Sequence, residues 1–191
     1  SFTAFIRGRS AHAGFAPEKG VHAISAAADA VAMIPMGHID EDTTVNIGMI
    51  TGGSATNVIP DGCTVKGEVR SLSHDKALKQ AGLVKNQFER SAFAVGADVD
   101  FKLDLVSKAY LTPPSHPVAV RFEKACIRLG LPVRLTKTMG GSDNNVMAQS
   151  GITGLVVANA MNRCHALDEF TTVEELAASA ELTLQLMTAG N

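Results

Sequence analysis

Residues 1–34 read SFTAFIRGRSAHAGFAPEKGVHAISAAADAVAMI, and this stretch sets the pattern of the fold. Apolar and polar residues alternate from Phe2 to Gly8, which predicts a β-strand. The segment from Ser10 to Gly20 contains glycine, proline and lysine and is typical of a loop. Val21 to Ile34 is rich in alanine, with apolar residues at helical spacing. The chain therefore begins with a strand, a loop and a helix in that order.

Segments with the apolar spacing of strands and of helices continue to follow one another as far as residue 106. A strand of β-branched residues is predicted at Thr44–Thr51 and a second strand at Thr64–Leu72. A helix capped by Ser73 or His74 follows at residues 74–95, and a further strand at Val99–Val106. The order β-α-β-β-α-β is that of the split βαβ motif, in which an antiparallel sheet carries both helices on one face. We therefore expect an α+β, ferredoxin-like domain with four antiparallel strands over residues 1–112.

Pro113 and Pro114 indicate a domain boundary, after which the sequence alternates in the manner of an α/β protein. Residues 113–191 predict helices at Pro117–Leu129, Asp143–Gln149 and Thr172–Met187, and strands at Val133–Thr138 and Ile152–Ala158. Two strands are too few for an independent parallel sheet, which is covered on both faces. The chain also begins without Met and within a predicted strand. We expect residues 113–191 to be the C-terminal portion of an α/β domain whose N-terminal portion lies upstream.

The charge balance excludes several classes of partner. The chain has 17 basic and 19 acidic side chains and a formal net charge of −2, so we expect no nucleic acid and no anionic membrane as a partner. The apolar stretches are too short to span a bilayer. The three cysteines form no CxxC pair and are odd in number, which favours a reducing cytoplasm over a disulfide framework.

Three candidate residues lie in the first domain. His12 is surrounded by small residues on a glycine-flanked loop, where an imidazole can donate a hydrogen bond to an oxyanion or act as acid or base; the alternative is a surface histidine. Asn57 follows Gly52-Gly53, in a segment that a turn explains nearly as well. Arg70 shares a strand face with Glu68 and has the planar fork that binds a carboxylate, although an ordinary surface ion pair is the more common arrangement.

Three more candidates lie in the second domain. Gly141 and Asp143 belong to a glycine turn at a helix start, where backbone N–H groups attract anions; the alternative is that Ser142 or Asp143 is an ordinary N-cap. His165 follows a predicted parallel strand, and ligands of α/β sheets bind beyond the carboxyl ends of such strands. A single histidine is more often structural than a metal ligand, and the remaining histidines form no HExxH motif.

Five segments together resemble the peptidase T-like zinc aminopeptidases, relatives of carboxypeptidase G and the aminoacylases. They read GRSAHAGFAPEKGVHAI, IDEDTTVNIGMITGGSATNVIPD, GEVRSLS, GGSDNNV and CHALDEFTTVEEL. The resemblance implies a catalytic domain that holds two bridged zinc or other divalent ions, with a βαββαβ lid domain inserted into it. It also implies a homodimer formed through the lid and a short peptide as the substrate.

The resemblance also implies a role for each candidate residue. His12 corresponds to the lid histidine that, in dimeric relatives, reaches the partner's active site and polarises the scissile carbonyl. Asn57 and Arg70 correspond to lid residues that hold carbonyl or carboxylate groups of the substrate. Asp143 and its glycines match the active-site loop, and His165 matches the last metal-binding histidine.

The family's other metal ligands and its general base would precede residue 1, so we expect the chain alone to be inactive. The function implied for the full-length protein is that of a di- or tripeptide aminopeptidase. A carboxypeptidase or an amide deacylase of the same family is the alternative, although residues 105–110 lack an arginine that some carboxypeptidases carry there. A second alternative is a self-associating module without catalysis, because an exposed sheet edge can pair between copies.

Overall fold

The computed structural model describes residues 1–158 and 160–188. The chain divides into two compact units, Ser1–Ala109 and Tyr110–Asn191. The domain boundary predicted from the sequence lies three residues later, after residue 112. Each unit is described by itself below.

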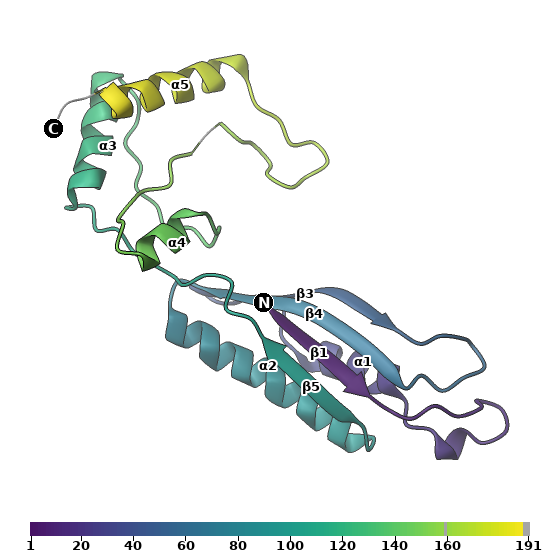
Figure 1. Ribbon diagram of the computed structural model, residues 1–191. Coiled ribbons are helices and arrows are strands. Elements are labelled where there is room, and N and C mark those ends of the chain that lie inside the picture. Colours follow the sequence, from purple (N-terminus) through teal and green to yellow (C-terminus); the bar gives the residue numbers. More distant parts are fainter. Residues whose placement is uncertain (159, 189–191) are drawn as a thin grey trace. The chain divides into compact units, whose positions relative to one another are not determined.

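The first unit is built on one antiparallel sheet (Figure 1). Its strands are β1 (Phe2–Arg7), β2 (Gly37–Asp40), β3 (Thr43–Gly52), β4 (Gly62–Ser71) and β5 (Asp98–Leu103). They lie in the order β2-β3-β4-β1-β5, and all neighbours are antiparallel. The predicted α+β fold with an antiparallel sheet is confirmed, but the number of strands was wrong. The short strand β2 adds a fifth at the edge, because the acidic segment after α1 turns back at Glu41 and Asp42 and pairs with the start of β3.

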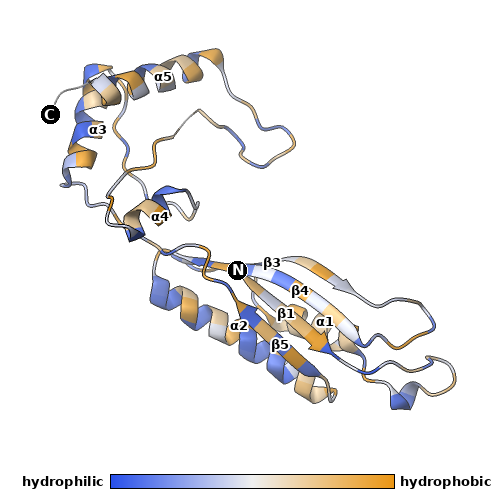
Figure 2. Cartoon of the chain, in the orientation of Figure 1, coloured by the Kyte–Doolittle hydropathy of each residue, from blue (hydrophilic) through white to orange (hydrophobic). Residues whose placement is uncertain are grey.

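Helices α1 (Ala23–Met33) and α2 (His74–Ala94) pack on one face of this sheet and against each other. The side chain of Ser73 caps α2 by accepting a hydrogen bond from the backbone N–H of Lys76 (3.5 Å). Four alanines of α1 are fully buried, and their small side chains let the helix approach the strands closely. Figure 2 shows hydrophilic and hydrophobic residues along the length of α2, as expected of a helix with one buried face.

The core of the first unit follows from the strand alternation. Phe2, Ala4 and Ile6 of β1 are buried on the helix side, while the residues between them face the other way. The Phe2 ring lies 5.5 Å from that of Phe101 in β5 and 6.3 Å from that of Phe88 in α2. These aromatic contacts join the sheet to the longer helix and fix which face of the sheet is covered.

The second unit contains three helices: α3 (Pro117–Arg128), α4 (Asn144–Gln149) and α5 (Val173–Thr188). Ala125 and Cys126 of α3 pack with Leu182 of α5 in a small buried cluster. The helices were predicted within two residues at each end. The strands expected at Val133–Thr138 and Ile152–Ala158 were wrong, because among the described residues neither segment forms a strand. A strand needs a neighbour for its backbone hydrogen bonds, and no described segment pairs with these two. None of the described helices is long and apolar enough to cross a lipid bilayer.

Candidate functional site

Two loops at one end of the sheet are joined along their backbones. We call them the His12 loop (residues 8–22) and the Asn57 loop (residues 53–61). The amide of Ala13 donates to the carbonyl of Asn57 (3.0 Å), the amide of Ile59 donates to the carbonyl of Ala11 (2.8 Å), and His12 and Val58 form an isolated antiparallel bridge. Both His12 and Asn57 are exposed. The structure therefore brings these two predicted site residues together.

The imidazole of His12 is held within its own loop. Its Nδ1 accepts hydrogen bonds from the amides of Gly14 (3.1 Å) and Phe15 (3.2 Å). The Phe15 ring stacks on it, with ring centroids 4.2 Å apart and planes inclined by 24°. The amide of Ala16 also donates to the His12 carbonyl (3.1 Å), which closes one turn of backbone.

Arg70 lies in β4, and its guanidinium forms a bidentate pair with Glu68. The Nε and Nη2 atoms of Arg70 donate to the two Glu68 carboxylate oxygens at 2.7 and 2.9 Å. These hydrogen bonds hold the pKa of Glu68 below its usual value and raise that of Arg70. The pair is 42–45% exposed, so water screens it. The ion pair expected as the simpler interpretation is present, and it presents the guanidinium in a geometry that suits a carboxylate.

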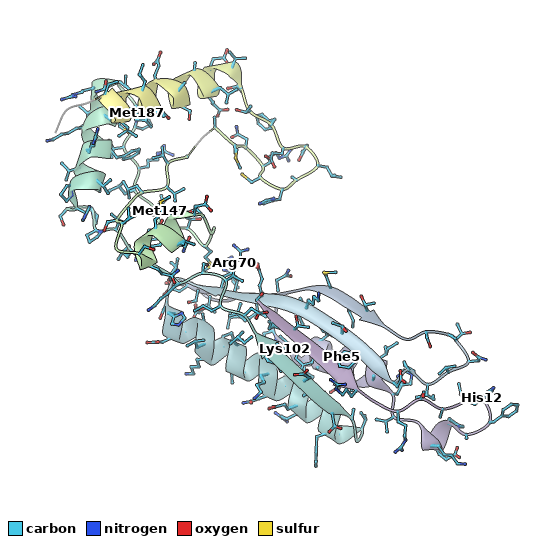
Figure 3. All side chains as sticks on the ribbon, viewed as in Figure 1. Phe5, His12, Arg70, Lys102, Met147 and Met187 are labelled. Carbon is cyan, nitrogen blue, oxygen red and sulfur yellow. The ribbon has the colours of Figure 1, made fainter. Side chains whose placement is uncertain are left out.

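Arg70 is at the other end of the sheet from His12 (Figure 3). Strand β4 begins at Gly62, directly after the Asn57 loop, and reaches Arg70 eight residues later. A strand rises about 3.3 Å per residue, so this separation is about 26 Å. The three predicted residues of the first unit therefore lie at two separate places, His12 with Asn57 at one end of the sheet and Arg70 at the other. Arg70 lies near the end of the sheet at which β1 begins, since the pairing of β1 with β4 starts at Phe2 and Gly67.

Gly141 and Asp143 are exposed and precede α4. Asp143 occupies the N-cap position, but its side chain makes no capping hydrogen bond. The buried Asn145 instead holds the turn, because its Oδ1 accepts from the amide of Ser142 (3.0 Å). The ordinary capping role considered for Asp143 is thus absent, and its carboxylate remains exposed.

His165 lies on a loop closed by paired hydrogen bonds between Asn162 and Phe170 (3.0 and 3.2 Å). Its imidazole is exposed, and its amide donates to the Glu169 carboxylate (2.8 Å). Both Arg163 and His165 have positive φ, 57° and 66°. Such backbone is uncommon for residues with a side chain and concentrates at functional sites.

An exposed imidazole suits zinc, which in proteins takes about four nitrogen, sulfur or oxygen ligands. Across residues 1–158 and 160–188, however, no three His, Cys, Asp or Glu side chains stand close enough to hold a metal ion. The described residues therefore do not fit a metal site by themselves. His165 can provide one ligand, and the others would have to come from outside the described chain.

Phe15 is a residue of this site that the sequence did not reveal. It was part of a loop rich in small residues, and nothing in the spacing set it apart. Its role could have been predicted from its position, because an aromatic residue three positions after a candidate histidine can contact that histidine in a turn.

The chain is similar to known proteins over most of its length. Residues 1–93 match the family model M20_dimer, the peptidase dimerisation domain. The protein YqjE of Bacillus subtilis (strain 168), itself uncharacterised, is 35% identical over 184 residues, which are 96% of this chain and 50% of YqjE.

Two solved structures are also similar. The aminopeptidase PepT of Bacillus cereus is 38% identical, with a TM-score of 0.83, and a tripeptidase of Staphylococcus aureus is 28% identical, with a TM-score of 0.88. Each match covers 97% of this chain and 50% or 49% of the other protein. The chain thus spans about half the length of these relatives.

Proposed function

We propose that the chain belongs to a metal-dependent peptidase that removes residues from the amino end of di- or tripeptides, because residues 1–93 match the peptidase dimerisation domain. The observation that carries this proposal is the 38% identity to the Bacillus cereus aminopeptidase over 97% of the chain. The similar tripeptidase supports a short substrate. The free cysteines, Cys63, Cys126 and Cys164, favour a cytoplasmic location.

The positions of His12 and Arg70 support a site shared between two copies of the chain. A fully extended tripeptide spans about 10 Å, whereas the part of β4 between the Asn57 loop and Arg70 is already about 26 Å long. Both residues belong to the same compact unit, so movement of that unit as a rigid body does not bring them together. If both act on one substrate, they come from different copies.

Each residue then has a distinct role. His12 of one copy donates a hydrogen bond to the scissile carbonyl of a substrate held by the other copy and stabilises the oxyanion that develops there. Asn57, on the loop bonded to that of His12, reaches the same site and holds a substrate carbonyl. Arg70 acts on the site of its own copy and binds a carboxylate of the peptide. In the second unit, His165 is the proposed metal ligand, and Gly141 and Asp143 are proposed substrate-binding residues.

The free edge of β3 supports association of two copies by pairing of these edges. Strand β2 pairs with Thr43–Val45, and among the described residues no strand pairs with the far half of the ten-residue strand β3 on that side. Met49 and Ile50 are adjacent there, 60% and 52% exposed, and point to opposite faces of the sheet. A long apolar edge is a template for pairing with another strand, and a two-fold axis brings the same edges together.

An amide deacylase or carboxypeptidase of the same family is the second candidate. It is favoured by Arg70, because the guanidinium already binds the Glu68 carboxylate through two hydrogen bonds. A substrate with a free carboxylate next to the scissile amide would make the same contact.

A chimera tests the proposal. This chain replaces the matching half of the Bacillus cereus aminopeptidase, and hydrolysis of tripeptides, C-terminally amidated tripeptides and N-acyl amino acids is measured with Zn²⁺, Co²⁺ or Mn²⁺. We expect metal-dependent release of the N-terminal residue from tripeptides. Preferential cleavage of N-acyl amino acids would favour the deacylase. A dimeric but inactive chimera would favour the self-associating module, and turnover by the 191-residue chain alone would contradict an incomplete metal site.

A further inference from the structure

Nδ1 of His12 accepts two backbone hydrogen bonds, from Gly14 at 3.1 Å and Phe15 at 3.2 Å. A ring nitrogen that accepts hydrogen bonds cannot also carry a hydrogen, so the single hydrogen of the neutral imidazole resides on Nε2. The ring therefore has one edge bound to its own loop and a donor on the opposite edge.

Phe15 adds a second restraint. Its ring stacks on the imidazole at 4.2 Å, yet its side chain is 87% exposed. An aromatic ring with so much surface in water gains little from burial in its own domain. The contact covers one face of the imidazole and opposes rotation of the ring about its Cβ–Cγ bond.

Two other histidines show what simple capping looks like. Nδ1 of His22 accepts from the amide of Ser25 (3.2 Å) at the start of α1, and Nδ1 of His116 accepts from the amide of Val118 (3.3 Å) at the start of α3. Each has one backbone donor at Nδ1. His12 has two donors and a stacked ring, although the turn that it begins is not continued as an α-helix.

We propose that Phe15 is a positioning residue for His12. The stacked ring and the amides of Gly14 and Phe15 hold the neutral imidazole in the Nε2–H tautomer, with that N–H directed outward from the loop as a hydrogen-bond donor. The catalytic meaning of this arrangement rests on the proposed function, because the acceptor is the scissile carbonyl of a substrate. The restraint on the ring itself is a property of this chain.

The first test is ¹⁵N NMR of the histidine rings in the whole chain at a pH where they are neutral. We expect Nδ1 of His12 to resonate as a nitrogen without hydrogen and Nε2 as one that carries it. Phe15→Ala should shift both signals toward the average of the two tautomers and leave those of His22 and His116 unchanged. Phe15→Tyr should retain the wild-type signals. A hydrogen on Nδ1 in the wild-type protein, or unchanged signals in Phe15→Ala, would overturn the proposal.

The second test uses the chimera described above. Phe15→Ala should lower kcat about tenfold with KM within about twofold, because a misplaced donor weakens a contact made in the transition state. Phe15→Tyr should restore kcat. The matched control is Phe93→Ala, since Phe93 is 85% exposed on α2. An unchanged kcat in Phe15→Ala would overturn the positioning role. An inactive wild-type chimera would count against the proposed function alone, because the NMR signals test the restraint on His12 without turnover.

Discussion

The free edge of β3 leads to a quantitative prediction about self-association. Replacing both Met49 and Ile50 with threonine keeps residues that favour strands and removes the apolar surface. Full burial of a Met or Ile side chain stabilises by about 2 kcal/mol, and roughly half of each side chain is still exposed, so each contributes about 1 kcal/mol when a second copy covers it. A two-fold dimer contains two copies of each, which gives about 4 kcal/mol and a dimer Kd raised about 1,000-fold.

Sedimentation velocity over a range of protein concentrations measures this change. The control is Leu83→Gln, which removes an apolar side chain of similar exposure (54%) from α2. We expect the control to dimerise as the wild-type chain does and the double variant to be monomeric at micromolar concentration. Circular dichroism should show the same fold in all three proteins. An unchanged dimer Kd in the double variant would refute the assignment of the β3 edge.

Three further predictions concern the stability and reactivity of the chain. Phe88→Ala should reduce the free energy of unfolding by about 3–5 kcal/mol in denaturant titrations, because the side chain is fully buried; a loss below about 1 kcal/mol would contradict its place in the core. One thiol, that of Cys164, should react rapidly with a maleimide at pH 8, whereas burial raises the pKa of Cys63 and Cys126 and should slow their reaction until the chain unfolds; any fast-reacting thiol in folded Cys164→Ser would be inconsistent with this. The folded-state pKa of Glu68 is depressed, so its stabilisation is present above the unfolded-state pKa of about 4.3 and is lost as pH falls through the folded-state value. Relative to Glu68→Gln, the wild-type chain should lose about 0.5 kcal/mol between about pH 5 and 3, and a loss of the opposite sign would refute the pairing.

The elements of the first unit were predictable because their periodicity reports burial. Phe2, Ala4 and Ile6 alternate with outward-facing residues, and this pattern is the physical reason that β1 packs as it does. Strand β2 was missed because four residues with one partly buried member carry no alternation. For Ile152–Ala158, in contrast, a strand was predicted that the structure does not contain. Its composition favours a buried strand, but the pairing depends on a neighbour that no described residue provides.

The site residues were harder to predict because sequence gives chemical type without position. His12 and Asn57 are 45 positions apart in sequence, and the backbone hydrogen bonds between their loops reveal that they form one cluster. Arg70 was grouped with them, and the length of β4 separates it. The stacking of Phe15 on His12 depends on the turn between them, which spacing alone does not define.

Mixed dimers test most directly whether the site is shared between two copies. Chimeras carrying His12→Ala or Arg70→Ala should each be nearly inactive toward tripeptides. After equal amounts are mixed and allowed to exchange subunits, about half of the dimers contain one of each, and each such dimer has one intact site, with His12 from one copy and Arg70 from the other. We predict recovery of about one quarter of the wild-type activity. No recovery, despite confirmed exchange, would mean that His12 and Arg70 act within one copy and would contradict the account.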